Sequence, residues 1–186
     1  FPLDRFLTVD SLGSASANFR LEGRYFSWPQ AKTSVNAGIR QLFYKEHEYK
    51  DITLQATLDK THLRGTMVSK DPDAPLDLVF RGDSLQQQYQ VGLGGYIGKV
   101  DLQALHLMQE PLTMGLKVDL QGFIGEHSAY ALKARFDSLS MADSRKTYTL
   151  GSLDIDMASD LKKTTLDVKT GDLQLTFRAD TSLAGF

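Results

Sequence analysis

The amino-acid sequence predicts an all-β fold of roughly ten to twelve mostly antiparallel strands, with at most short helices. The first reason is that apolar and polar residues alternate through many short stretches, the pattern of a strand with one dry face and one wet face. The second is that these stretches recur about every ten residues, separated by Gly, Pro and Asp rather than by long helical segments.

The first part of the chain is predicted to hold a short turn within residues 1–12 and strands at residues 17–23 and 32–43. Pro29 is expected to end the first strand, because proline cannot donate a hydrogen bond to a ladder. Residues 46–50 (EHEYK) are predicted to form a polar turn.

A β-hairpin is predicted from residues 51–58 and 62–69, joined by a short turn. In the first of these strands every second residue is apolar: Ile52, Leu54, Ala56 and Leu58. A rigid loop at Asp71–Pro75 and an alternating strand at residues 76–80 follow.

The middle of the chain is less regular. Residues 91–98 (VGLGGYIG) are rich in glycine, which predicts a turn or a bulge where two backbones approach closely. Residues 100–108 fit both a helical and a strand spacing of apolar residues, and both remain open. Residues 112–122 then show the longest strict alternation in the chain, with apolar residues at Leu112, Met114, Leu116, Val118 and Leu120.

The last third of the chain repeats one pattern. Strands are predicted at residues 130–136, 150–157, 165–169 and 171–180. In the final strand the apolar residues Leu173, Leu175 and Phe177 alternate with polar ones. Asp is the favoured polar residue, and its charge discourages aggregation between sheet edges.

Composition excludes several classes of protein. The chain has 21 Lys and Arg against 23 Asp and Glu, so the basic surplus of a nucleic-acid-binding surface is absent. Without cysteine it has neither disulfides nor thiolate metal sites. No break in composition marks a second domain, so residues 1–186 are expected to form one β-rich domain. Because the chain starts at Phe1 without a leader, we expect it to be a fragment excised from a longer protein.

Two motifs resemble catalytic or cofactor signatures and fail on closer inspection. Gly92–Gly98 departs from a dinucleotide fingerprint because Ile97 replaces the third glycine and no helix follows. Ser159–Lys162 and Lys169–Gly171 match the Ser-x-x-Lys and Lys-Thr-Gly motifs of penicillin-recognising enzymes, but the Ser-Asp-Asn element is missing. We interpret the glycine stretch as a turn or bulge where backbones approach closely, and the other two matches as polar turns between strands.

No metal or cofactor site is predicted. The four histidines are His47, His62, His106 and His127, none of them at a metal-ligand spacing, so we expect surface or rim positions. Asp154 and Asp156 share one strand face without a calcium-binding loop, and a solvated face is the expected explanation. The chain is therefore expected to be no enzyme and to need no cofactor.

The order of several segments resembles a known family. The segments are Val68–Asp73 (VSKDPD) with Leu76–Asp83 (LDLVFRGD), Val100–Leu107 (VDLQALHL), Lys117–Gly122 (KVDLQG), Tyr148–Asp156 (YTLGSLDID) and Leu166–Asp172 (LDVKTGD). Their succession over roughly residues 50–180 is similar to that in AsmA/TamB-like (translocation and assembly module) envelope proteins of the Bacteroidetes type.

The resemblance implies a curled or partly open, groove-like sheet with an apolar concave face. It also implies a periplasmic location in the cell envelope and a membrane anchor outside this fragment. The implied function is non-enzymatic, in lipid transport or outer-membrane biogenesis, with lipid acyl chains and outer-membrane assembly proteins as partners and no nucleic acid.

A hydrolase or carbohydrate-active β-domain ranks last among the functions considered, because the sequence shows no convergent polar residues. Two other functions rank above it. In the first, the apolar face is a lipid-binding groove, with Leu116, Val118, Leu120, Leu173, Leu175 and Phe177 as the candidate lipid-facing residues. In the alternative, the chain is a β-sandwich that serves as a structural or protein-interaction module and closes its own core.

Overall fold

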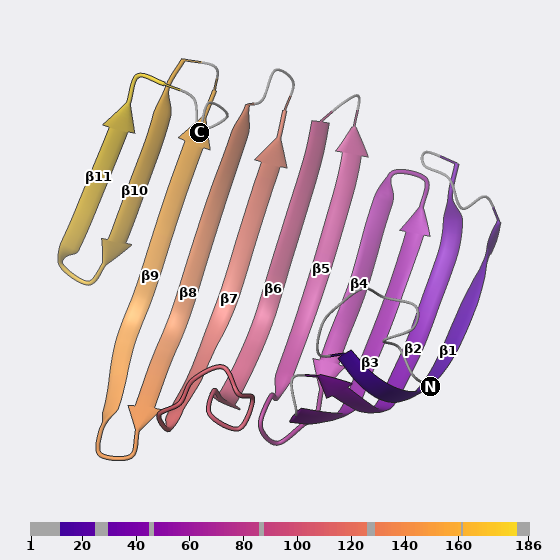
Figure 1. Ribbon diagram of the computed structural model, residues 1–186. Coiled ribbons are helices and arrows are strands. Elements are labelled where there is room, and N and C mark those ends of the chain that lie inside the picture. The colour runs from indigo at the N-terminus through magenta and orange to yellow at the C-terminus, as the bar shows by residue number, and fades with distance from the viewer. Residues whose placement is uncertain are drawn as a thin grey trace.

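The computed structural model is one open sheet of eleven antiparallel strands, and their order in the sheet is their order in the chain (Figure 1). It describes residues 12–24, 30–44, 47–85, 88–125, 129–160 and 162–181. The strands are β1 (Leu12–Arg24), β2 (Lys32–Tyr44), β3 (His47–Asp59), β4 (His62–Ser69), β5 (Leu76–Leu85), β6 (Gln88–Asp101), β7 (Leu112–Ile124), β8 (Tyr130–Asp143), β9 (Thr147–Ser159), β10 (Thr164–Thr170) and β11 (Leu173–Ala179). The predicted fold class, strand number and open sheet are confirmed.

The prediction of a polar turn at residues 46–50 is wrong from His47 onward. His47, Glu48, Tyr49 and Lys50 begin β3, where they pair with the end of β2 from Tyr44 back to Gln41. Ladder hydrogen bonds use backbone groups, so a polar stretch continues a strand when its neighbour is in register. Residue 46, residues 1–11 with most of the expected first turn, and Pro29 lie outside the described residues.

The glycine-rich stretch is part of β6, and it carries the expected irregularity. Gly95 has φ of 145°, and the register between β6 and β7 shifts between Ile97 and Val100. Residues 102–106 form a turn rather than a helix or a strand. Its start is capped by Asp101, whose carboxylate accepts hydrogen bonds from the N–H groups of Gln103 and Ala104, each at 3.0 Å.

One row of directly paired residues crosses the whole sheet. Directly paired residues in antiparallel strands point to the same face. Starting at β1, successive pairs join one residue from each strand: Leu21, Val35, Ala56, Gly65, Phe80, Leu93, Leu120, Ala134, Ile155, Val168 and Leu175. We call this the central apolar row, because no member has a polar side chain.

The neighbouring row on the opposite face is polar at every position except Gly92. It runs through Glu22, Ser34, Thr57, Arg64, Arg81, Gly92, Gln121, Lys133, Asp156, Asp167 and Thr176. We call it the central polar row. A period of two in each strand, combined with the register between neighbouring strands, therefore places an apolar row on one face of the sheet and a polar row on the other.

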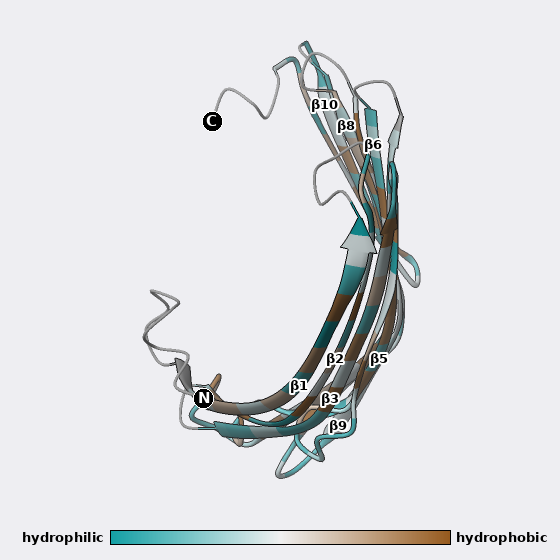
Figure 2. Cartoon of the chain, turned by 90° about the vertical axis from the view of Figure 1, so that its right-hand side faces the viewer, coloured by the Kyte–Doolittle hydropathy of each residue, from teal (hydrophilic) through white to brown (hydrophobic). Residues whose placement is uncertain are grey.

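The sheet curls along the length of its strands, so that its profile is an open C (Figure 2). Backbone irregularities occur at about the same distance along the length of several neighbouring strands. They are register shifts beside Ser16, Gly115 and Ile97, and positive φ angles of 51° at Asp51 and 55° at Ser138. Bulges and such residues bend and twist a strand, which accounts for a curl at this level. Buried apolar side chains, among them Ile52, Leu116 and Val118, lie close to it.

Candidate functional site

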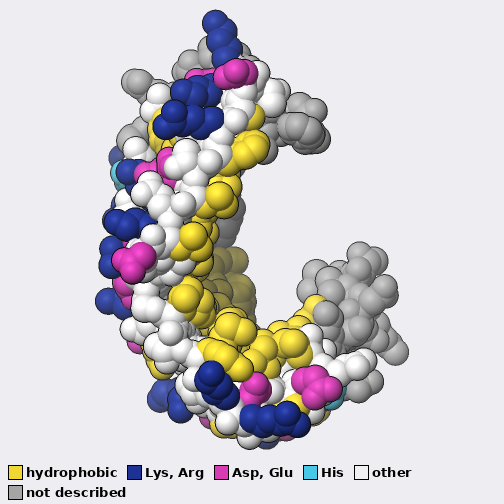
Figure 3. Space-filling view, turned by 90° about the vertical axis from the view of Figure 1, so that its left-hand side faces the viewer, with side chains coloured by type: hydrophobic (Ala, Val, Ile, Leu, Met, Phe, Trp, Pro, Cys, Tyr) yellow, Lys and Arg dark blue, Asp and Glu magenta, His cyan; other side chains and the backbone are white. Residues whose placement is uncertain are grey.

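The apolar face lines the inside of the curl, whereas Lys, Arg, Asp and Glu gather on its outside (Figure 3). All six candidate lipid-facing residues are on this apolar face. Leu120 and Leu175 belong to the central apolar row itself. Leu116 and Val118 precede Leu120 at intervals of two in β7, and Leu173 and Phe177 flank Leu175 in the same way in β11. We call the concave apolar surface the trough.

The six residues differ strongly in exposure. Leu116 and Val118 are only 8% and 4% exposed, near the curl in the middle of the sheet. Leu173, Leu175 and Phe177 are 68%, 60% and 53% exposed, because β11 has a neighbouring strand on one side only. Other large exposed residues of the same face include Phe19, Leu21 and Val91. A contiguous exposed apolar surface of this kind typically marks an interaction site.

One glycine of the central apolar row is covered by an aromatic ring. A Cβ atom on Gly65 would lie 2.2 Å from the ring of Phe80, its partner in β5. The ring therefore lies over the glycine backbone and fills the place of the missing side chain. This contact keeps the floor of the trough apolar where the row has no side chain of its own.

The polar face carries ion pairs between strands and within one strand. Lys133 Nζ lies 3.3 Å from Asp156, and Arg135 lies 3.5 Å from Asp154 and 3.0 Å from Asp137. The hydrogen bond to Asp137, followed by the charges of Asp137 and Asp154, raises the pKa of Arg135 above its ordinary value. A depression of about 390 Å³ among these residues is lined by charges of both signs. Asp154 and Asp156 thus lie on a solvated face and are paired with cations, as expected.

The residues of the penicillin-enzyme motifs lie at the β9–β10 and β10–β11 turns. The Ser159 hydroxyl, at the end of β9, forms a 2.9 Å hydrogen bond with the Thr164 hydroxyl. Lys162 follows in the turn, where its N–H donates to Asp160 at 2.7 Å. Lys169 and Thr170 are the last residues of β10, and only Gly171 is in the turn that follows. The interpretation as turns is therefore wrong for Ser159, Lys169 and Thr170, which end strands, and correct for Lys162 and Gly171, whereas Leu161 lies outside the described residues.

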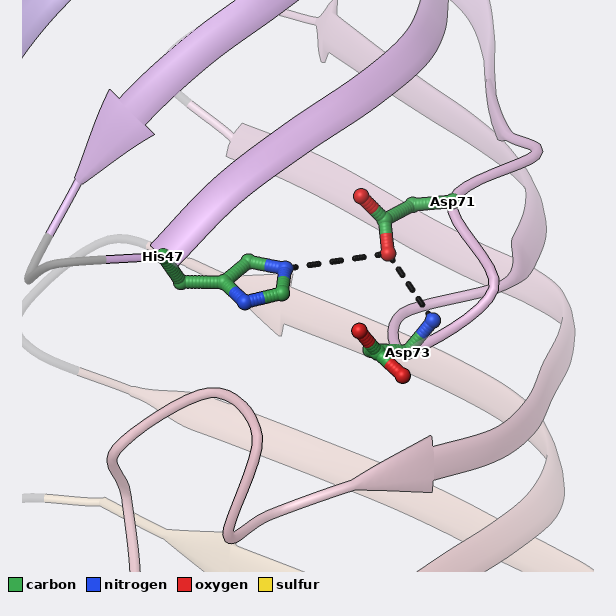
Figure 4. Close-up of side chains that lie close together, drawn as sticks. All are labelled: His47, Asp71 and Asp73. Atoms are coloured by element: carbon green, nitrogen blue, oxygen red, sulfur yellow. Dashed lines mark hydrogen bonds and ion pairs between the residues drawn. The ribbon is translucent and has the colours of Figure 1, made fainter.

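A second group of polar residues gathers at one end of the sheet (Figure 4). His47 begins β3, and Asp71 and Asp73 belong to the loop between β4 and β5. Asp71 is 1% exposed, and its carboxylate accepts hydrogen bonds from the N–H groups of Lys50 (2.7 Å), Asp73 (2.9 Å) and Ala74 (3.2 Å). Burial, followed by the charge of Asp71 and then Tyr44, raises the pKa of nearby Tyr49.

The expectation that the histidines occupy surface or rim positions is wrong for His47, whose side chain is 11% exposed. Its Nδ1 lies 3.1 Å from the carbonyl oxygen of Ala104, and its Nε2 lies 3.7 Å from Asp71 Oδ1. His62 and His106 are exposed, as expected, and His127 lies outside the described residues. Sequence spacing could not reveal His47, because its neighbours come from two distant loops.

No family model, no curated protein sequence and no solved structure matches this chain. Within the described residues there is no helix with the length and apolar character needed to cross a membrane.

Proposed function

We propose that this chain is a non-enzymatic segment of an AsmA/TamB-like envelope protein and that its trough holds lipid acyl chains. The observation that carries the proposal is the central apolar row, which crosses all eleven strands without a polar side chain. An amphipathic sheet has to cover its apolar face with another layer or with a ligand. In this proposal acyl chains provide part of that cover.

The dimensions of the trough suit an extended apolar ligand. Ten steps between eleven strands at about 4.8 Å each make the row about 48 Å long. One layer of acyl chains is about 15 Å thick, half of the roughly 30 Å hydrocarbon core of a bilayer. The trough is therefore long enough for several chains in succession along its axis.

The expected affinity is low. An acyl chain of about 14 methylenes, half covered on an open face, gains about 5 to 6 kcal/mol at about 0.8 kcal/mol per buried methylene. That free energy corresponds to a dissociation constant of about 0.1 mM. No ionisable side chain of the central apolar row holds the ligand in one place. Weak, uniform contacts of this kind allow a lipid to move along the trough.

The cellular role rests on the family resemblance. In this proposal the segment belongs to a periplasmic part of a membrane-anchored protein that takes part in lipid transport or outer-membrane biogenesis. Outer-membrane assembly proteins are its expected partners.

A protein-interaction module is the second candidate function. Within the described part of the chain, β1 and β11 each pair on one side only, so both edges can accept an added strand. In this case another protein, or another part of the same protein, covers the trough and closes the core.

The test uses a photoreactive fatty acid and mass-spectrometric mapping of its crosslinks. We expect crosslinks on the apolar residues of β10 and β11 in the unaltered chain. The double substitution Leu175→Glu/Phe177→Glu should abolish them while the circular dichroism spectrum stays unchanged, because both side chains are already exposed.

The matched control is Gln174→Glu/Thr176→Glu, which adds the same charges to the opposite face of the same strand. It should keep the crosslinks. Crosslinks that survive in the apolar-face variant, or that are lost equally in both variants, would contradict lipid binding in the trough. A stable dimer or a co-purifying protein that protects β11 from the reagent would favour the interaction module.

A further inference from the structure

The His47 ring has a defined proton arrangement. Its Nδ1 lies 3.1 Å from the Ala104 carbonyl oxygen, which can only accept a hydrogen bond, so Nδ1 carries a hydrogen. In the neutral ring Nε2 is then a lone-pair acceptor. Nε2 is buried and has no hydrogen-bond donor among the described residues.

The Nε2 atom, which has no hydrogen-bond partner, faces carboxylate oxygens. Asp71 Oδ1 is 3.7 Å away, and a carboxylate oxygen of Asp73 completes a group of three ligand atoms within 4.8 Å of one another (Figure 4). A nitrogen lone pair and a carboxylate oxygen repel each other. A buried arrangement of this kind needs a positive charge between the two atoms.

We propose that His47, Asp71 and Asp73 bind a divalent transition-metal ion such as Zn²⁺ or Mn²⁺. An imidazole nitrogen with two carboxylates favours such an ion over Ca²⁺ or Mg²⁺, which prefer oxygen ligands alone. Ligands at about 2.0 to 2.2 Å from one tetrahedral ion are about 3.4 Å apart, close to the observed 3.7 Å between Nε2 and Oδ1. Rotation of the half-buried Asp73 side chain can close the remaining distance.

The surroundings of the three residues match those of known metal ligands. A metal-bound histidine commonly donates its other ring N–H to a backbone carbonyl, as His47 does to Ala104. A metal-bound carboxylate is commonly held by hydrogen bonds, as Asp71 is by three backbone N–H groups.

The proposed ion joins three segments at one end of the sheet. These are the start of β3, the β4–β5 loop and the loop after β6. The loop after β6 contacts the site in two places: the Ala104 carbonyl accepts a hydrogen bond from His47, and the Asp101 N–H donates one of 2.8 Å to the Asp73 carbonyl. The ion therefore has a structural role, and it does not depend on whether the trough binds lipid.

The experiment titrates Zn²⁺ and, separately, Mn²⁺ into the tag-free, chelator-treated chain by isothermal calorimetry. Melting temperature is measured with and without each ion. We expect one ion per chain and a higher melting temperature when it is bound. His47→Ala and Asp73→Asn should each weaken metal binding at least tenfold. Asp71 is not substituted, because its carboxylate also accepts the hydrogen bonds that hold the β4–β5 loop.

The matched control is the exposed pair of His62 and Asp83, whose Nδ1 and Oδ1 atoms lie 2.5 Å apart and where Arg64 already supplies a positive charge. His62→Ala should leave metal binding unchanged. Absence of binding, or binding that is unaltered in His47→Ala and Asp73→Asn, overturns the proposal.

The competing explanation is that a protonated His47 ring supplies the positive charge. The chain would then bind no metal in the calorimetric titration. That result would also overturn the metal site.

Discussion

Strands β7 and β11 carry the same pattern on the same face of the sheet, yet their apolar side chains are in opposite environments. Val118 in β7 is 4% exposed, whereas Leu175 in β11 is 60% exposed. Strand β7 lies between two long neighbours and beside the curl, whereas β11 has one neighbour. The alternation therefore specifies the face, and the surrounding strands specify the burial.

This difference divides the trough into two regions. Around β7 the concave side chains are buried and belong to the small core of the sheet. At β11 they remain available to a ligand. Substitutions matched between the two regions should separate the residues that stabilise the fold from the exposed residues that do not.

The largest expected effect comes from a buried charge. Val118→Asp should destabilise the sheet by about 4 kcal/mol or more, because an unpaired carboxylate is placed in the core. Leu175→Asp should change the free energy of unfolding by less than about 1 kcal/mol, since water already reaches this position. Urea denaturation of both variants measures the difference. Equal losses would show that β11 is covered in solution.

A second comparison uses two glycines with positive φ. A Cβ atom on Gly95 would lie 2.1 Å from the Asp77 carbonyl oxygen, whereas one on Gly171 would meet nothing within 4 Å. Gly95→Ala should therefore cost about 3 kcal/mol and Gly171→Ala about 1 kcal/mol, the latter from backbone strain alone. Chemical denaturation of the two variants tests this order, and a reversed order would be inconsistent with the close approach of β5 and β6.

A third comparison removes equal numbers of atoms from the two regions. Leu116→Ala should destabilise the protein by about 2 to 3 kcal/mol through lost burial and a cavity. Leu173→Ala should cost less than about 1 kcal/mol, because the side chain is 68% exposed. The two midpoints of thermal unfolding provide the measurement. If Leu173→Ala proves as costly as Leu116→Ala, another layer packs on β11.

The smallest expected effect lies on the polar face. The hydrogen bonds to Asp83 from His62 and then Arg64 lower the pKa of Asp83 below 3.8. Because the folded-state pKa is depressed, this stabilisation is present above about pH 4 and is lost as the pH falls through the folded-state value. The pair is at the surface, so Asp83→Asn should cost less than about 1 kcal/mol at pH 7.

The control for Asp83→Asn is Asp156→Asn, whose partner Lys133 is more exposed than Arg64. Denaturation over a series of pH values should show a loss for Asp83→Asn at pH 7 that shrinks as the pH falls below about 4. An equal loss at every pH would mean that the side chain acts by packing rather than by charge.

The sequence by itself determined the fold class and the face on which each apolar residue lies. Leu116, Val118 and Leu120 share a face with Leu173, Leu175 and Phe177 because a strand repeats every two residues. The hairpin from β3 to β4 follows from the same local pattern. These features depend on residues that are neighbours in the sequence, so each stretch of the chain specifies them independently of the others.

Tertiary structure decided how deeply each of these residues is buried and which polar groups meet. The curl and the number of neighbouring strands bury Val118 and leave Leu175 exposed, and neither is visible in a strand's own pattern. His47 meets Asp71 because the register of β3 and the course of the β4–β5 loop bring them together. Contacts between distant segments depend on the path of the backbone, which local alternation does not specify.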